Sequence, residues 1–143
     1  MAIEKFGSAH WVGGLKDGKG HVSTESGALK SQPYGFNTRF ENTPGTNPEE
    51  LVGAAHAACF TMALSKALGG AGVAADELET KATVFLEKVG DDFAISKINL
   101  HLRASVSGIT EEKFRSTAEE VKSACPVSKA LATVPIGLDI AFI

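Results

Sequence analysis

Residues 46–64 read TNPEELVGAAHAACFTMAL, a stretch that predicts a long apolar helix. Asn47 is suited to the N-cap, Pro48 to the first helical position and Glu49 to the positive end of the helix dipole. A glycine-rich LGGAG ends the helix after about twenty residues, or about 30 Å. We therefore expect a central helix that is covered on most sides. Between Leu51 and Leu64 the main interruptions of the apolar character are Gly53, His56, Cys59 and Thr61.

The composition is that of one globular domain spanning residues 1–143, since 43% of the residues are hydrophobic and 22% are charged. The net charge is −3, and the 14 Lys and Arg form no cluster, so nucleic-acid binding is disfavoured. The N-terminal MAIEKFGSAHWVGG lacks the apolar region of a signal peptide, and no run reaches the roughly 18 apolar residues of a membrane span. We expect a cytoplasmic protein with no nucleic-acid or membrane partner.

An N-terminal β-region precedes the helix. The segments 9–15 and 20–26 flank the turn KDGKG, whose glycines suit a hairpin. Residues 27–48 are rich in Gly, Pro and Asn, so we expect a loop with a short strand at 36–40. That loop carries Arg39.

A second β-region follows the helix. Segments 80–89 and 93–106 are separated by GDD, and apolar residues alternate from Ile98 to Val106, which predicts a hairpin with one buried face. A capped helix over 110–125, a short helix over 126–132 and a last strand over 134–143 complete the chain. The order of elements predicts an α+β protein with an antiparallel β-sheet and a long buried central helix.

The chain has two cysteines, Cys59 and Cys125, which in a reducing cytoplasm are more often reduced, metal-bound or catalytic than bridged. Cys59 taken alone is also compatible with a small buried core residue. Cys125 lies between two predicted helices, just before Pro126, where backbone N–H groups favour a thiolate. If the two thiols are close in the fold they can cycle between dithiol and disulfide, but sequence separation does not decide that proximity.

His56 stands three residues before Cys59, so the two side chains can share a helix face as a thiol–imidazole pair or as metal ligands. The other histidines are scattered in β-regions, so we expect no metal site and interpret His56 as a polar group satisfied within the helix packing. Two alternatives to redox chemistry remain open. One is a Cys59–His56 hydrolase or acyl-transfer enzyme, which should not depend on Cys125. The other is a stress-induced structural or ligand-binding protein with inert thiols.

Three runs carry a family resemblance: QPYGFNTRFE at 32–41, GTNPEELVGAAHAACFTMAL at 45–64 and ACPVSKAL at 124–131. They closely resemble the osmotically inducible protein C family, and the similarity extends over nearly the whole chain. The position of Arg39 in NTRFE and of His56 in AAHAAC is similar to the osmotically inducible proteins rather than to their organic-hydroperoxide-resistance relatives.

The resemblance implies a thiol-dependent peroxidase that reduces organic hydroperoxides to alcohols, in defence against oxidative and osmotic stress. It implies an intertwined homodimer with shared active sites. The implied catalytic residues are Cys59 as the peroxidatic thiol, Cys125 as the resolving thiol, and Arg39 with Glu49 completing the site. A Cys59–Cys125 disulfide is the implied intermediate. No bound cofactor or metal is implied, but an external dithiol reductant of lipoyl type is.

Physical chemistry gives independent reasons for these residue types. A buried Cys59 thiolate needs a nearby cation, which Arg39 can supply, and Glu49 can hold that guanidinium by a bidentate pair. Ten residues separate Glu49 from Cys59, or about 15 Å along a helix, so one chain's Glu49 does not easily reach its own Cys59. Two such helices packed antiparallel across a two-fold axis bring them together. The apolar residues Phe36, Phe40, Phe60 and Met62 either favour an alkyl or aryl hydroperoxide or are plain core.

Overall fold

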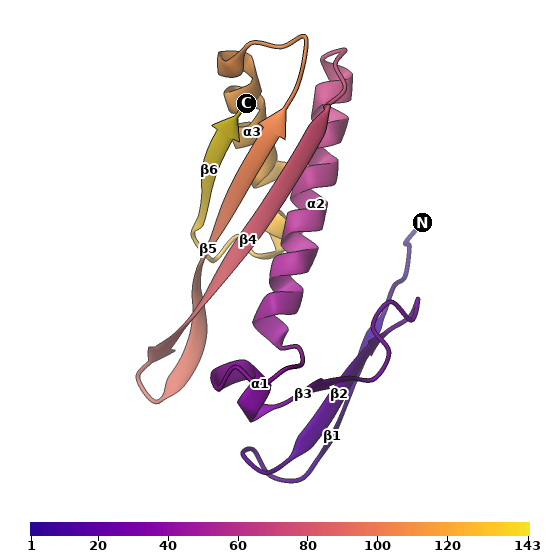
Figure 1. Ribbon diagram of the computed structural model, residues 1–143, viewed down its shortest axis with the longest axis vertical. Helices are drawn as coiled ribbons and strands as arrows, with labels where there is room; N and C mark the ends of the chain where they lie inside the picture. The colour runs from indigo at the N-terminus through magenta and orange to yellow at the C-terminus, as the bar shows by residue number, and fades with distance from the viewer. The chain divides into compact units, whose positions relative to one another are not determined.

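The structure is a computed structural model that describes residues 1–143, with strands and helices in the α+β arrangement predicted from the sequence (Figure 1). The chain forms two compact units, 1–51 and 52–143. The long helix α2, Pro48–Gly70, begins in the first unit and continues through the second.

The first unit contains a three-stranded antiparallel sheet in the order β1-β2-β3. The predicted hairpin is confirmed by β1, Gly7–Val12, and β2, Lys19–Thr24, which pair in register. The third strand is β3, Gln32–Tyr34.

The short helix α1, Phe36–Phe40, occupies the segment for which we predicted a strand, so that prediction is wrong. The Gly35 N–H donates to Thr38 Oγ1 at 2.8 Å, and the Thr38 hydroxyl donates to the Gly35 carbonyl at 3.0 Å. Such local side-chain to backbone bonds compete with strand pairing and favour a helical turn.

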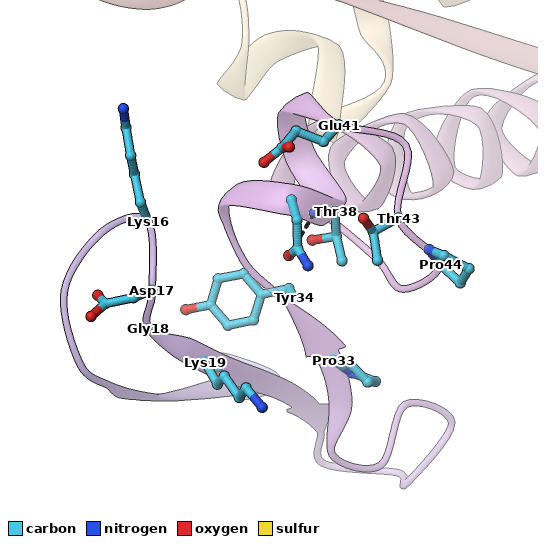
Figure 2. A pocket seen from close by; sticks show the side chains of 12 residues that line it. Lys16, Asp17, Gly18, Lys19, Pro33, Tyr34, Thr38, Glu41, Thr43 and Pro44 are labelled. Carbon is cyan, nitrogen blue, oxygen red and sulfur yellow. Dashed lines mark hydrogen bonds between the residues drawn. The ribbon is translucent and has the colours of Figure 1, made fainter.

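A hollow of ≈ 580 Å³ lies between the β1–β2 turn and α1 in this unit. Figure 2 shows the Tyr34 ring between the turn that carries Asp17 and the helix that carries Thr38. The lining includes charged and hydroxyl groups but no thiol, so this hollow has no residue for the expected redox chemistry.

The second unit contains the sheet β4-β5-β6. The strands β4, Glu77–Val89, and β5, Asp92–Ser105, form the predicted antiparallel hairpin. However, β6, Ile136–Phe142, pairs parallel to β5, so this sheet is mixed rather than purely antiparallel. The chain between β5 and β6 passes through α3, Glu111–Ala124, and α4, Pro126–Ala130, which is the helical crossover that a parallel pair needs.

The core of the second unit lies between one face of this sheet and the helices α2 and α3 (Figure 1). The alternation predicted for β5 is confirmed, since Ile98, Leu100 and Leu102 are buried while His101 and Arg103 are exposed. The helices contribute Phe60, Leu64, Leu68, Phe114, Ala118, Val121 and Cys125 to the same cluster.

The start of α2 follows the sequence prediction. The Glu50 N–H donates to Asn47 Oδ1 at 2.8 Å, as expected for an N-cap asparagine. Further along, a Cβ added to Gly53 would lie 3.0 Å from the Ala82 carbonyl oxygen of β4. The absence of a side chain at Gly53 therefore allows α2 to approach the sheet closely.

The face of α2 opposite the core is uncovered in a single chain. Its exposed residues are small or apolar except for Lys66, and Met62 is exposed to 76%. By length and composition alone α2 could cross a membrane, with a mean hydropathy of 1.4, but core helices of soluble proteins also meet this criterion. The sequence expectation of a helix covered on most sides is therefore not met within this chain. The exposed residues of this face are Ala54, Ala55, Ala58, Met62, Ser65 and Lys66.

Candidate active site

The two thiols, which are 66 residues apart in the sequence, come together in the second unit. Cys59 projects from the middle of α2 and is half-buried, while Cys125 is 1% exposed at the junction of α3 and α4. The Cys125 side chain lies close enough to the Cys59 thiol to raise its pKa, both residues line one hollow, and both cysteines are free. This proximity is the condition that the sequence left open for a dithiol able to become a disulfide.

Both thiols line an open hollow of ≈ 680 Å³. Its walls are mainly apolar, with Lys66 at the edge as the charged exception. Of the apolar residues that the sequence singles out, only Met62 lines this hollow. Phe60 is instead fully buried in the core. The remaining lining residues are Ala63, Ala67, Val121, Ala124 and Pro126.

The Cys59 thiol is not activated by the groups around it in this unit. Burial raises its pKa, the neighbouring Cys125 raises the pKa further, and a hydrogen bond with the backbone of Val127 lowers it. None of these influences comes from a cation. Lys66, which lines the same hollow, is not among these influences, so no cation of this unit favours the nucleophilic thiolate form of Cys59.

Such a cation is held in the first unit by the expected pair of Arg39 and Glu49. The Arg39 Nε donates to Glu49 Oε1 at 3.0 Å and to Oε2 at 3.2 Å, and Nη2 donates to Oε1 as well. The Glu49 side chain is 11% exposed and that of Arg39 is 37% exposed, so the carboxylate is enclosed while part of the guanidinium faces outward. The pair fixes the direction of the guanidinium.

Arg39 also lines a smaller hollow of ≈ 180 Å³ in the first unit. Its guanidinium lies 5.4 Å from the centre of the Phe40 ring, and Phe36 packs against Phe40 with ring centroids 4.9 Å apart. Phe40 thus lies against the cation, Phe36 packs on Phe40, and both rings line this hollow rather than the core. Trp11, Leu15, Tyr34 and Pro48 complete the lining.

His56 does not use its hydrogen-bonding capacity on Cys59. Its ring is fully buried, and Nε2 lies 2.8 Å from the Ser128 hydroxyl oxygen. That oxygen lies 3.0 Å from Cys125 Sγ, so the contact leads to the second thiol. The other ring nitrogen, Nδ1, has no partner, so His56 is only half satisfied within the helix packing. Burial lowers the His56 pKa, which keeps the ring neutral at pH 7.

Ser128 is the residue of the site that sequence reasoning missed. It is 2% exposed, and its backbone N–H donates to Cys125 Sγ at 3.4 Å. The available signal was its spacing, since Cys125 caps α4 and the third residue after a cap is the one whose N–H meets the capping side chain. No group of three or more His, Cys, Asp or Glu side chains lies together as metal ligands would.

Comparison with known proteins identifies the family. The family model described as OsmC-like protein matches residues 40–139. The chain belongs to the OsmC family. It is 56% identical over 131 residues to Peroxiredoxin OsmC of Escherichia coli (strain K12), a match that covers 92% of each chain. It is 30% identical over 112 residues to the organic hydroperoxide resistance protein OhrB of Bacillus subtilis (strain 168), covering 78% of this chain and 80% of OhrB.

A solved OsmC-family structure supports the same assignment at the level of the fold. The crystal structure of Bacillus subtilis OhrB has a TM-score of 0.71 at 26% identity and covers 95% of this chain and 98% of its own. The resemblance proposed from the sequence motifs is therefore confirmed. The identity to the OsmC relative is 56% against 30% to OhrB, in agreement with the assignment to the OsmC branch from Arg39 and His56.

Proposed function

We propose that this OsmC-family protein is a thiol-dependent peroxidase that reduces organic hydroperoxides to alcohols, with Cys59 as the peroxidatic and Cys125 as the resolving thiol. The observation that carries the proposal is the proximity of the two thiols, which line one mainly apolar hollow open to solvent. The names of the two relatives, a peroxiredoxin and an organic hydroperoxide resistance protein, support the peroxidase class and the substrate class.

The reaction proceeds in two steps on the protein. The Cys59 thiolate attacks the distal oxygen of the hydroperoxide, the O–O bond breaks, and the leaving alkoxide takes up a proton to become the alcohol. Cys59 is left as a sulfenic acid. The Cys125 sulfur then attacks the Cys59 sulfur, so that the S–S bond forms, the S–O bond breaks and water leaves.

An external dithiol, for which we propose a lipoyl-type compound, reduces the Cys59–Cys125 disulfide and is itself oxidised to a disulfide. No bound cofactor takes part in this cycle. A reducing cytoplasm keeps both thiols ready for the next turnover. The resulting role is defence against oxidative and osmotic stress. The apolar walls beside Cys59, among them Met62 and Val121, favour an alkyl or aryl group on the hydroperoxide over hydrogen peroxide.

Arg39 and Glu49 complete the proposed site from a second subunit. Burial raises the Cys59 pKa, so a cation beside the sulfur is needed, and the guanidinium held by Glu49 is oriented for such a role. Because α2 is continuous, Glu49 and Cys59 of one chain are separated by about 15 Å along the helix. Two chains that pair through the exposed apolar faces of α2 would form an intertwined homodimer in which each subunit supplies the cation for its partner's thiol.

The experiment that tests this function follows cumene hydroperoxide consumption with a dithiol as reductant, in wild type, Cys59→Ser and Cys125→Ser. We expect turnover by wild type, no activity in Cys59→Ser, and arrest as a sulfenic acid in Cys125→Ser. Equal inertness of all three proteins with every hydroperoxide tried would favour a binding protein with inert thiols. Hydroperoxide consumption by Cys125→Ser at the wild-type rate would mean that the dithiol reduces the Cys59 sulfenic acid directly and that Cys125 is not the resolving thiol. A hydrolase or acyl-transfer enzyme would consume no hydroperoxide in any of the three proteins, and the bonding of His56 to Ser128 rather than to Cys59 already disfavours it.

A further inference from the structure

A buried polar chain leads away from the resolving thiol into the core. It runs from Cys125 Sγ to the Ser128 hydroxyl at 3.0 Å and from there to His56 Nε2 at 2.8 Å. The three residues are 1%, 2% and 0% exposed. Burying a hydroxyl and an imidazole costs free energy unless their hydrogen bonds are made, so a plain core would favour apolar residues at these positions.

The unpartnered nitrogen of His56 gives the direction of these bonds. Nδ1 is buried without any hydrogen-bond partner, and a buried N–H left without an acceptor is rarer than an under-used acceptor. The neutral ring therefore carries its proton on Nε2 and donates to the Ser128 oxygen. With that oxygen acting as acceptor, the single hydrogen of the Ser128 hydroxyl is left to donate to Cys125 Sγ.

Cys125 Sγ consequently receives two donors from one residue, the Ser128 hydroxyl at 3.0 Å and the Ser128 backbone N–H at 3.4 Å. Donors aimed at a sulfur favour its thiolate over its thiol. In the proposed cycle the Cys125 thiolate is the group that attacks the Cys59 sulfenic acid.

We infer that His56 and Ser128 are positioning residues for the resolving step, in which His56 holds the Ser128 hydroxyl as a donor to Cys125 and so speeds disulfide formation without affecting the attack of Cys59 on the hydroperoxide. The inference rests on the proposed function. Neither residue changes the stoichiometry of disulfide formation. The Cys125 thiol gives its proton to solvent, the thiolate forms the S–S bond, and the departing hydroxide takes up a proton to leave as water.

The variants remove the hydroxyl donor to Cys125 or the group that orients it. Ser128→Ala removes the Ser128 hydroxyl and keeps the backbone N–H, whereas His56→Leu removes the imidazole that orients the hydroxyl. His56→Gln keeps an N–H donor at a position close to that of Nε2 and should restore the bond to Ser128. Ser96→Ala is the matched control, because the Ser96 hydroxyl is buried without a hydrogen-bond partner and its loss breaks no bond.

The test mixes each reduced full-length protein with one equivalent of cumene hydroperoxide, quenches at intervals, and measures by mass the sulfenic acid and the disulfide. We expect sulfenic acid formation at the wild-type rate in all variants. Disulfide formation should be slower by about tenfold or more in Ser128→Ala and His56→Leu, the usual effect of a lost hydrogen bond to a charged group. It should be near the wild-type rate in His56→Gln and Ser96→Ala.

Rescue by His56→Gln and the separation of the two steps distinguish this role from a structural one. A structural defect would slow sulfenic acid formation as well and would not be repaired by His56→Gln. Equal loss in both steps, or disulfide formation as slow in His56→Gln as in His56→Leu, would overturn the inference. Wild-type rates of disulfide formation in Ser128→Ala and His56→Leu would overturn it while leaving the proposed function standing. If wild type forms no sulfenic acid, the proposed function fails and the inference falls with it.

Discussion

The Glu49 carboxylate accepts hydrogen bonds from both Nε and Nη2 of Arg39, and it is the more enclosed partner of the pair. This arrangement fixes where the positive charge points more than it stabilises the fold. The Arg39 side chain is 37% exposed, and ion pairs with an exposed member contribute only about 1 kcal/mol or less. Orientation of a cation is thus the main consequence of the pair.

Replacement of Glu49 should therefore affect activity more than stability. In Glu49→Gln the side chain keeps its size but loses its charge, so the guanidinium is no longer held from two sides. We expect kcat/KM for cumene hydroperoxide to fall by about tenfold or more, the effect of losing charge-assisted hydrogen bonds, with a thermal midpoint within a few degrees of wild type. Glu41→Gln, which removes an exposed carboxylate nearby in sequence, is the control and should leave both values unchanged. Full activity in Glu49→Gln would contradict the proposed role of the pair.

The second prediction concerns the Cys59 pKa, which burial and the neighbouring Cys125 raise. If Arg39 supplies the missing cation in the assembled protein, it lowers this pKa, and Arg39→Ala should restore the raised value. The measurement is the rate of Cys59 alkylation by iodoacetamide against pH, in a Cys125→Ser background so that one thiol remains. We expect the midpoint of this rate to move to higher pH in Arg39→Ala. Identical profiles with and without Arg39 would show that the cation does not act on Cys59.

A third prediction tests whether the site is shared between subunits. Arg39→Ala and Cys59→Ser should each be inactive alone, but a mixed dimer contains one complete site, formed by Cys59 of one subunit and Arg39 of the other. Random pairing of equal amounts gives half mixed dimers with one working site of two, or about a quarter of wild-type activity. The two chains are unfolded together and refolded before the assay, with each variant refolded alone as the control. No gain of activity on mixing would mean that each site is built within one chain.

Much of the fold follows from local pattern. The alternation along β5 and the Asn47 cap of α2 were predictable because period-two burial and capping chemistry act over a few residues. The strand expected at 36–40 is instead α1, because the Thr38 side chain bonds Gly35 and closes a turn. The parallel pairing of β6 was not predictable, since strand direction depends on how α3 and α4 carry the chain back.

The candidate site, like the fold, was predictable from the sequence only in part. The residue types pointed to thiol chemistry. The proximity of Cys59 and Cys125, however, depends on the packing of α2 and α3 on one sheet face, which no sequence spacing encodes. The proximity of His56 to Cys59 along the helix was misleading. The imidazole bonds to Ser128 from a distant segment, because tertiary packing rather than the shared helix face selected its partner.

The fourth prediction concerns Gly53, where α2 approaches β4. A Cβ at this position would lie 3.0 Å from the Ala82 carbonyl oxygen and 3.6 Å from Val84 Cγ2, so Gly53→Val should push the helix from the sheet. We expect a loss of about 1 to 3 kcal/mol in the free energy of unfolding, as for other overpacked sites. Gly69→Ala is the control, because nothing lies within 4 Å of its added Cβ, and alanine there should be neutral or stabilising by up to about 1 kcal/mol. Equal urea midpoints of unfolding for Gly53→Val and wild type would show that α2 and β4 leave room for a side chain at residue 53.

The last prediction follows from the buried imidazole of His56, whose pKa burial lowers from the ordinary histidine value of about 6.5. The folded state holds this ring neutral, whereas the unfolded chain binds a proton below about pH 6.5, so the unfolded state gains protons as the pH falls. The stability that this difference contributes is present above pH 6.5 and is lost as the pH falls through the lowered folded-state pKa. Urea unfolding at pH 7.5 and pH 5.5 should therefore show a smaller decrease in stability for His56→Gln than for wild type. His10→Gln, at an exposed histidine, should keep the wild-type decrease. If His56→Gln loses as much stability as wild type over this range, the acid sensitivity of the fold comes from other groups, and the ring is not held neutral by its burial.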